Sequence, residues 1–246
     1  MKDYYWLNED SIKFLERGYL KEGESPEKRI RDIAEAAEKY LKQGGFADKF
    51  EGYMKQGFYS LASPVWSNFG RSRGLPISCN GVYIEDKMHS ILEKQAEVGM
   101  QTKHGSGTSG YFGSLRGRGV PISVGGVSAG AVYFMELFDK VASIVSQGHV
   151  RRGSFAAYLP IDHPDIEEFL RIRSEGNPIQ EMSFAVCIDD EWMQSMVDGD
   201  KDKRKVWANV IKKRFETGYP YIFFTDNANK QAPECYRFKN PRIKSL

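Results

Sequence analysis

The stretch Leu75-Pro76-Ile77-Ser78-Cys79-Asn80-Gly81 runs directly into Val82-Tyr83-Ile84. The β-branched and aromatic residues of this run predict a strand that begins near the cysteine. A segment typical of a helix follows over 87–98, and a glycine-dense stretch then extends from Gly99 to Gly126. We therefore expect the Cys79 thiol at a strand end, facing a loop whose backbone amides can approach an anionic ligand. Such a placement suits redox or radical chemistry on a phosphorylated substrate.

Strands and helices alternate from residue 61 onward. Such alternation is typical of βα units and of a parallel sheet. The predicted strands are 155–159, 182–188 and 220–224, and the predicted helices are 131–145, 166–173, 190–196 and 206–215.

The first 60 residues instead predict helices. Asn8 or Asp10 can cap the first, Ser25-Pro26 opens the second, and 47–59 forms a third. The sequence therefore divides into an N-terminal helical region, 1–60, and an α/β region, 61–246.

The composition narrows the function classes. The 246 residues are 41% hydrophobic and 28% charged, with a formal net charge of +2. That charge gives no electrostatic case for a nucleic-acid or membrane partner, and no apolar run of about 18 residues predicts a membrane span. Three widely spaced cysteines and four histidines fit neither a disulfide framework nor a metal site. We expect a protein of the reducing cytoplasm that binds no metal.

The glycine-dense stretch contains a motif, Gly105-Ser106-Gly107-Thr108-Ser109-Gly110, that matches G-x-G-x-x-G. In a dinucleotide-binding fold this motif follows a strand and opens a helix, whereas here it follows a segment typical of a helix. The context therefore disfavours that fold. Glycines still allow a backbone to approach a ligand closely, and a plain flexible loop is the alternative.

Paired arginines mark two loops. Arg116 and Arg118 follow the glycine motif, and Arg151 and Arg152 lie in a polar segment, 146–153. Arginine binds phosphate through two parallel hydrogen bonds, so both loops are candidates to contact one anionic ligand. Solvated surface arginines are the alternative.

The three cysteines differ in their surroundings. Cys79 has an alternative role as a buried thiol that packs as a small hydrophobic residue. Cys187 lies in an apolar strand and is expected in the core, and Cys235 is expected to be exposed in a polar tail.

From about Leu61 to the end, these segments resemble the large (α) subunit of class I ribonucleotide reductase. The resemblance rests on five motifs in the same order. Ser63-Pro64 resembles the Thr/Ser-Pro of the substrate phosphate site, and Ser78-Cys79 resembles the Ser-Cys that opens the first barrel strand. Asp86 resembles the effector-binding aspartate, and residues 107–122 resemble the segment with the first specificity loop. The second specificity loop, S-Q-G-x-V-R-x-G, is resembled by Ser146-Gln147-Gly148-His149-Val150-Arg151-Arg152-Gly153.

The resemblance implies a fold and a set of site residues. It implies an α/β fold in which the helical region precedes the first half of a ten-stranded barrel built from two five-stranded halves. It implies radical reduction of ribonucleotides, with Cys79 as one thiol of a redox pair. The implied substrate contacts are Ser63, Ser78 and Gly107, the implied effector contacts are Asp86, Lys87, Met88 and Arg116, and the implied relay loop contains Gln147 and Arg151.

The resemblance also implies cofactors and partners. No cofactor is bound directly; ATP or a deoxynucleoside triphosphate acts as effector, and a separate metal-containing small subunit supplies the radical. The implied partners are that small subunit, a second large subunit, and a reductant of the thioredoxin or glutaredoxin type. A diphosphate substrate fits the class I pattern.

Other functional residues of the family have no counterpart in the sequence. The family's finger loop carries an N-L-C-x-E motif with the radical cysteine, and 240–246 resembles only the approach to it. No segment resembles the N-terminal ATP-cone. We expect one piece of a split or truncated large subunit, inactive until the C-terminal half complements it. The alternatives are a non-catalytic effector-binding module and an unrelated nucleotide-binding α/β protein.

Overall fold

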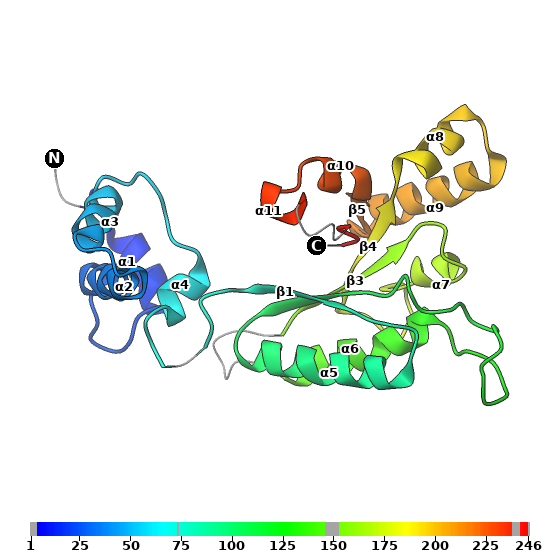
Figure 1. Ribbon diagram of the computed structural model, residues 1–246, viewed down its shortest axis with the longest axis horizontal. Helices are drawn as coiled ribbons and strands as arrows, with labels where there is room; N and C mark the ends of the chain where they lie inside the picture. Colours follow the sequence, from blue (N-terminus) through cyan, green and yellow to red (C-terminus); the bar gives the residue numbers. More distant parts are fainter. Residues whose placement is uncertain (1–3, 73, 146–152, 238–241, 246) are drawn as a thin grey trace. The chain divides into compact units, whose positions relative to one another are not determined.

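A computed structural model describes residues 4–72, 74–145, 153–237 and 242–245 (Figure 1). These residues form two compact units. The helical unit contains the described residues up to Ser78 together with His104–Ser106, and the α/β unit contains most of the remainder. None of the described helices is both long and apolar enough to cross a membrane.

The helical unit contains helices α1 (Glu9–Glu16), α2 (Pro26–Leu41), α3 (Phe46–Lys55) and α4 (Ser63–Asn68). The predicted caps are confirmed, because the side chain of Asn8 accepts a hydrogen bond from Ser11 N–H and that of Ser25 accepts one from Lys28 N–H. The third helix ends at Lys55, earlier than predicted. Helix α4 was not predicted, because six residues are too few to display a helical period.

A buried arginine ties α2 to α4. Arg29 is only 2% exposed. Its guanidinium donates to the carbonyl oxygens of Trp66 (2.7 Å), Val65 (3.0 Å) and Phe69 (2.9 Å), at and just beyond the C-terminal end of α4. Burial lowers the pKa of Arg29 to about 10, so the guanidinium stays charged at neutral pH. The cation therefore faces the partial negative charge of the α4 C-terminus.

The α/β unit is built on one parallel sheet. Its strands pair in chain order, as expected for consecutive βα units; they are β1 (Cys79–Tyr83), β2 (Gly107–Tyr111), β3 (Phe155–Pro160), β4 (Ser183–Ile188) and β5 (Tyr221–Phe224). Between or after them come α5 (Met88–Lys103), α6 (Ala131–Ile144), α7 (Ile166–Phe169), α8 (Asp190–Asp198), α9 (Lys201–Thr217), α10 (Thr225–Lys230) and α11 (Glu234–Arg237). The predicted helical region followed by a five-stranded parallel sheet is confirmed.

One face of the sheet holds the main core. Figure 1 shows α5 and α6 side by side along β1–β3, and their apolar residues join those of the strands in one cluster. Val82, Leu159 and Phe184 point to this side. Because side chains alternate along a strand, Cys79, Gly81 and Tyr83 point to the opposite face. On that face Tyr158 and Cys187 pack in a second, smaller cluster.

Several predicted boundaries differ from the structure. The motif Gly105–Gly110 does not form a loop throughout, because its last four residues belong to β2. Helix α7 ends at Phe169, and α9 begins at Lys201, where Asp200 accepts hydrogen bonds from two backbone N–H groups. The polar tail, for which no helix was predicted, contains the short helix α11.

Candidate functional site

Cys79 and Gly107 begin adjacent strands. They are direct partners in the parallel β1–β2 pair, and Gly81 faces Ser109 two positions on. Cys79 is exposed and Gly107 is half-buried. A Cβ on Gly81 would lie 3.1 Å from Ser109 Oγ, so the strands approach closely here. The result is an exposed thiol beside a backbone surface that has few side chains.

Two predicted substrate contacts lie in the helical unit. Ser63 is the first residue of α4, and its Oγ lies 3.3 Å from the hydroxyl oxygen of Tyr19. Arg29 fixes the other end of the same short helix. Ser78 immediately precedes Cys79 in the chain.

The predicted effector residues Asp86 and Arg116 form an ion pair. Asp86 follows β1, and Arg116 follows β2. Arg116 donates from Nε to Asp86 Oδ2 at 2.6 Å and from its backbone N–H to Oδ1 at 3.3 Å. Both side chains are about one-third exposed. The structure therefore brings together residues that are 30 positions apart, at a place that solvent and ligands can reach.

The other two predicted effector residues flank the start of α5. The Lys87 ammonium lies 2.9 Å from Glu85, and this hydrogen bond raises the pKa of Lys87. Met88 is the first residue of α5 and is exposed. A helix N-terminus favours negative charge. The cations Lys87 and Arg116 and the N-terminal end of α5 therefore together suit an anionic group.

His163 and Asp165 are functional candidates that the sequence did not reveal. Asp165 occupies the N-cap position of α7, yet it makes no side-chain cap on that helix. Its carboxylate instead accepts the backbone N–H groups of Arg118 (2.8 Å) and Ala131 (2.7 Å). The close approach requires glycine at 117 and 130, because a Cβ at these positions would lie 2.8 Å from Pro164 Cβ and 2.8 Å from Asp165 Oδ2, respectively.

The predicted relay residues Gln147 and Arg151 lie outside the described residues. The last residue of that motif, Gly153, is described. A Cβ there would lie 2.1 Å from the carbonyl oxygen of Ala142 and 2.7 Å from that of Val145. Glycine is therefore required where the chain leaves this motif and passes the end of α6.

The remaining two cysteines match their predicted surroundings. Cys187 is buried on the same face as Tyr158, and burial raises the pKa of its thiol to about 12. Cys235 is exposed. Within the described ranges, no group of three or more His, Cys, Asp or Glu side chains could hold a metal ion.

The face of the sheet opposite α5 and α6, which we call the open face, also carries a row of aromatic rings. Tyr83 is the strand partner of Tyr111, which in turn is the partner of Tyr158. The rings of Tyr83 and Tyr111 stack at 5.9 Å, and the Lys244 ammonium lies 5.0 Å and 5.5 Å from their centres. Burial raises the pKa of Tyr111 to about 12, whereas a hydrogen bond with Ser114 lowers that of Tyr83.

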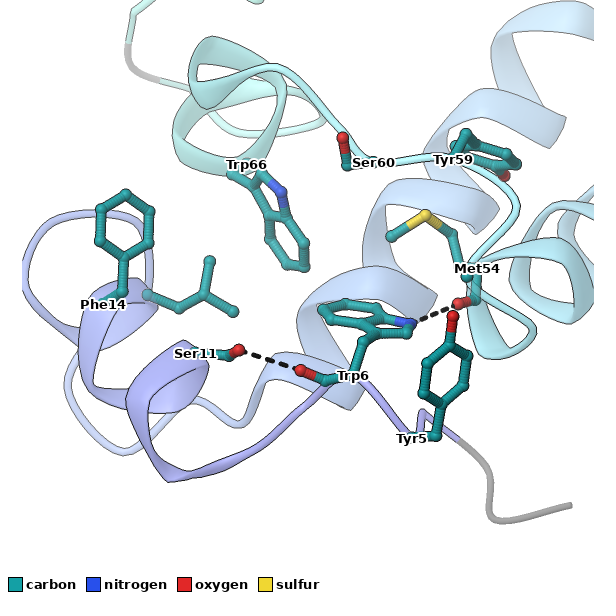
Figure 2. A pocket seen from close by; sticks show the side chains of 10 residues that line it. Tyr5, Trp6, Ser11, Phe14, Met54, Tyr59, Ser60 and Trp66 are labelled. Atoms are coloured by element: carbon teal, nitrogen blue, oxygen red, sulfur yellow. Dashed lines mark hydrogen bonds between the residues drawn. The ribbon is translucent and has the colours of Figure 1, made fainter.

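A cavity of about 690 Å³ lies in the helical unit, and none of the predicted site residues lines it (Figure 2). Trp6 and Trp66 form much of its wall, and its hydrogen bonds are internal: Trp6 Nε1 donates to the carbonyl oxygen of Met54, and Ser11 Oγ donates to that of Trp6. None of the lining residues is charged. The cavity therefore offers a largely aromatic surface.

Comparison with known proteins identifies the family. Residues 77–203 match the family described as ribonucleotide reductase, barrel domain. The chain belongs to the ribonucleotide reductase family. The matched segment includes β1–β4, Cys79, Gly107 and the Asp86–Arg116 pair.

Individual ribonucleotide reductases are also similar to this chain. All of this chain superposes on the class Id ribonucleotide reductase alpha subunit of Actinobacillus ureae, with a TM-score of 0.92 and 51% identity, and it covers 45% of that chain. It is 30% identical over 230 residues to the putative ribonucleoside-diphosphate reductase large subunit of Frog virus 3 (isolate Goorha), covering 85% of this chain and 39% of the relative. It is 26% identical over 234 residues to the vitamin B12-dependent ribonucleoside-diphosphate reductase of Thermoplasma acidophilum, covering 88% of this chain and 30% of the relative.

The family match and the Actinobacillus and Frog virus 3 relatives confirm the expected class I large-subunit resemblance and exclude an unrelated nucleotide-binding protein. The chain spans less than half the length of each relative. The helical unit, only loosely matched by its motifs, belongs to the similarity as well, because the Actinobacillus subunit covers the whole chain.

Proposed function

We propose that this chain forms the part of a class I ribonucleoside-diphosphate reductase large subunit that carries one redox thiol and the specificity-effector site. One structural relationship carries the proposal. The first two strands place Cys79 beside Gly107 at their beginnings and hold Asp86 against Arg116 beyond their ends. A substrate site and a regulatory site would thus share one pair of strands.

The proposed reaction removes the 2′-hydroxyl of a ribonucleotide as water and replaces it with hydrogen. Two cysteine thiols supply two electrons and two protons and become a disulfide. Cys79 is proposed as one of these thiols, donating a proton to the leaving hydroxyl and then an electron to the substrate radical. Its exposure on the open face gives access both to substrate and to a second thiol.

The phosphate groups of the substrate are proposed to contact Ser63 and Ser78. Ser63 is the first residue of α4, so its hydroxyl lies at the N-terminal end of that helix. Gly107 would allow the ribose to approach the backbone, because it has no side chain. A diphosphate is the proposed substrate, in keeping with the names of the relatives from Frog virus 3 and Thermoplasma acidophilum.

The radical, the second redox thiol and the reductant are proposed to come from other parts of the enzyme. The remaining residues of the large subunit would supply the thiyl radical on a finger loop and the partner cysteine. A metal-containing small subunit would generate the radical, and a thioredoxin or glutaredoxin would reduce the disulfide. The bound effector would be ATP or a deoxynucleoside triphosphate.

A complementation experiment tests this assignment. The chain is mixed with a second polypeptide that carries the remaining large-subunit residues, a small subunit, a ribonucleoside diphosphate, an effector and a reductant. We expect deoxynucleotide formation from the mixture and none from the chain alone. Turnover by the isolated chain, or failure of the two large-subunit pieces to bind each other, would refute the proposal.

A second copy of the chain is proposed to cover α5 and α6. Exposed apolar side chains follow one side of each helix: Met88, Leu92 and Met100 on α5, and Tyr133, Leu137 and Ile144 on α6. The stripe on α5 begins at Met88, next to the proposed effector site, so dimerisation would enclose that site. Light scattering should give a dimer for the wild type and a monomer for Leu92→Glu.

The second candidate is a nucleotide-binding module without catalysis. One observation favours it: the Asp86–Arg116 pair and the start of α5 are complete within this chain. Both candidates predict nucleotide binding. Only the reductase predicts turnover after complementation, so that experiment separates them.

A further inference from the structure

The segment that carries Arg116 is held at both ends by residues 163–165, which follow β3. We call residues 115–130 the arm; it connects β2 to α6 and lies beside α7 in Figure 1. Backbone hydrogen bonds between Val120 and Ser128 and between Ile122 and Gly126 close its outer part into a hairpin-like turn. Its base contacts residues 163–168, which follow β3.

Asp165 joins the beginning of the arm to its end. The carboxylate is buried, with the residue only 6% exposed. One oxygen accepts the backbone N–H of Arg118, and the other accepts that of Ala131, the first residue of α6. Gly130 occupies the N-cap position of α6 but has no side chain that could accept a hydrogen bond from the first N–H groups of the helix. Asp165 therefore caps α6 from another segment, where a negative charge is favourable.

His163 holds the residue just before Arg116. Its Nε2 lies 2.8 Å from the carbonyl oxygen of Leu115, and its Nδ1 lies 3.0 Å from the backbone nitrogen of Asp165. A carbonyl only accepts and an N–H only donates, so Nε2 carries the proton and Nδ1 accepts. The buried ring thus uses both nitrogens to join the arm to the 163–165 stretch.

Two glycines make this close approach feasible. A Cβ on Gly117 would lie 2.8 Å from Pro164 Cβ. A Cβ on Gly130 would lie 2.8 Å from Asp165 Oδ2 and 2.9 Å from Arg118 Cβ, and Gly130 has a φ of +90°. Side chains at these positions would push the arm away from Asp165.

Arg116 is consequently held between two fixed backbone atoms. His163 fixes the Leu115 carbonyl before it, and Asp165 fixes the Arg118 N–H after it. From this position Arg116 reaches Asp86 through both its backbone and its side chain, and it donates from Nη1 to the carbonyl oxygen of Pro121. Displacing either fixed atom would change where the guanidinium points.

We propose that His163 and Asp165 are positioning residues for the effector site: they hold the arm so that Arg116 meets Asp86 and the phosphates of a nucleoside triphosphate. This inference rests on the proposed function, which assigns that site to an effector. The 163–165 stretch would set the geometry of the effector site. Because this stretch follows β3, it also connects the site to that strand.

Nucleotide binding to the 246-residue chain tests the proposal. Isothermal titration with dTTP, dATP, dGTP and ATP is performed on the wild type, Asp165→Asn, His163→Ala and His163→Gln. We expect at least a tenfold loss of affinity in Asp165→Asn and His163→Ala. His163→Gln should recover much of the loss, because an amide can donate to Leu115 and accept from Asp165. Glu168→Gln is the control, since it breaks only the partly exposed pair with Arg118.

A double-mutant cycle separates positioning from general loss of structure. In an Arg116→Ala background, Asp165→Asn should cost almost no further affinity, because its effect acts through Arg116. Additive losses, or unchanged affinity in both Asp165→Asn and His163→Ala, would overturn the proposal while leaving the effector site intact. No nucleotide binding by the wild type would refute the effector site and this inference together. If thermal melting shows that Asp165→Asn does not fold, the comparison of His163→Ala with His163→Gln decides.

Discussion

Cys79 faces Gly107 across the first two strands of the sheet, at the level where both strands begin. The thiol is exposed, and its strand partner has no side chain. The space beside the sulfur is therefore bounded by backbone on one side. The thiol contributes little apolar burial to either cluster of the sheet.

Replacing Cys79 by serine should separate chemistry from folding. In the complemented enzyme, we expect Cys79→Ser to abolish multiple turnover and to leave nucleotide affinity and thermal stability unchanged, because the residue is exposed. Product formation over time and calorimetric titration measure the two effects. Cys235→Ser, which removes another exposed thiol, should retain turnover. Loss of nucleotide binding in Cys79→Ser would mean that this cysteine has a structural role.

Arg116→Ala should weaken binding of deoxynucleoside triphosphates by about 10- to 100-fold, since a hydrogen bond to a charged group contributes roughly 1.5–3 kcal/mol. The variant also leaves Asp86 without its cation, which adds repulsion toward phosphate. Arg171→Ala removes an exposed arginine of the α/β unit and is the matched control. Equal affinities for wild type and Arg116→Ala would place the nucleotide elsewhere.

Gly153→Ala should destabilise the α/β unit. The added methyl group would lie 2.1 Å from the Ala142 carbonyl oxygen, so the chain or the end of α6 must move. We expect a loss of about 2 kcal/mol or more in the free energy of unfolding, within the range of other overpacked sites. Gly44→Ala is the comparison, because a Cβ there meets no atom within 4 Å and its φ is not positive. Chemical denaturation of both variants measures the difference.

The buried thiol of Cys187 should make stability fall at alkaline pH. Burial raises its pKa from 9.0 in the unfolded chain to about 12 in the folded one. Between these values the folded state binds more protons than the unfolded state, so stability is complete below pH 9 and is lost as the pH rises toward 12. The slope from this one group is at most about 1.4 kcal/mol per pH unit. Urea denaturation at pH 8, 9 and 10 should show a shallower decline in Cys187→Ala than in Cys235→Ala.

Arg29→Met should destabilise the helical unit. The variant keeps much of the side-chain volume but removes the guanidinium donor to the carbonyl groups of Val65, Trp66 and Phe69, of which that of Val65 still accepts the Phe69 N–H. We expect a loss of roughly 2–4 kcal/mol, because unsatisfied buried acceptors cost about 1–3 kcal/mol each and part of the strain relaxes. Lys39→Met, at an exposed position of the same helix, should have a much smaller effect. Similar unfolding midpoints for the two variants would show that the buried guanidinium is dispensable.

The strands of the sheet could be predicted closely because their signals are local. β3 and β4 were located to within one residue at each end, since runs such as Phe184-Ala185-Val186 have strong strand preference and clear flanking turns. β2 was hidden by its composition. Gly107-Thr108-Ser109-Gly110 has the content of a loop, and it forms a strand because β1 and β3 pair with it on both sides.

The site could be predicted only where a motif names its residues. Asp86 and Arg116 were each expected as effector contacts from the resemblance, and the structure brings the two residues into contact. The roles of His163 and Asp165 could not be predicted, because both residues act on backbone groups more than 30 positions away. Backbone partners leave no trace in residue identity, and the two glycines that accommodate them resemble ordinary turn residues.

The order of the strands has a consequence for how the protein forms. Each strand pairs with the one before it in the chain, so every new pairing joins segments that emerge from the ribosome in succession. The sheet can therefore grow by addition of one βα unit at a time, without waiting for a distant segment. Folding during synthesis would thus complete the β1–β2 surface around Cys79 before β4 and β5 exist.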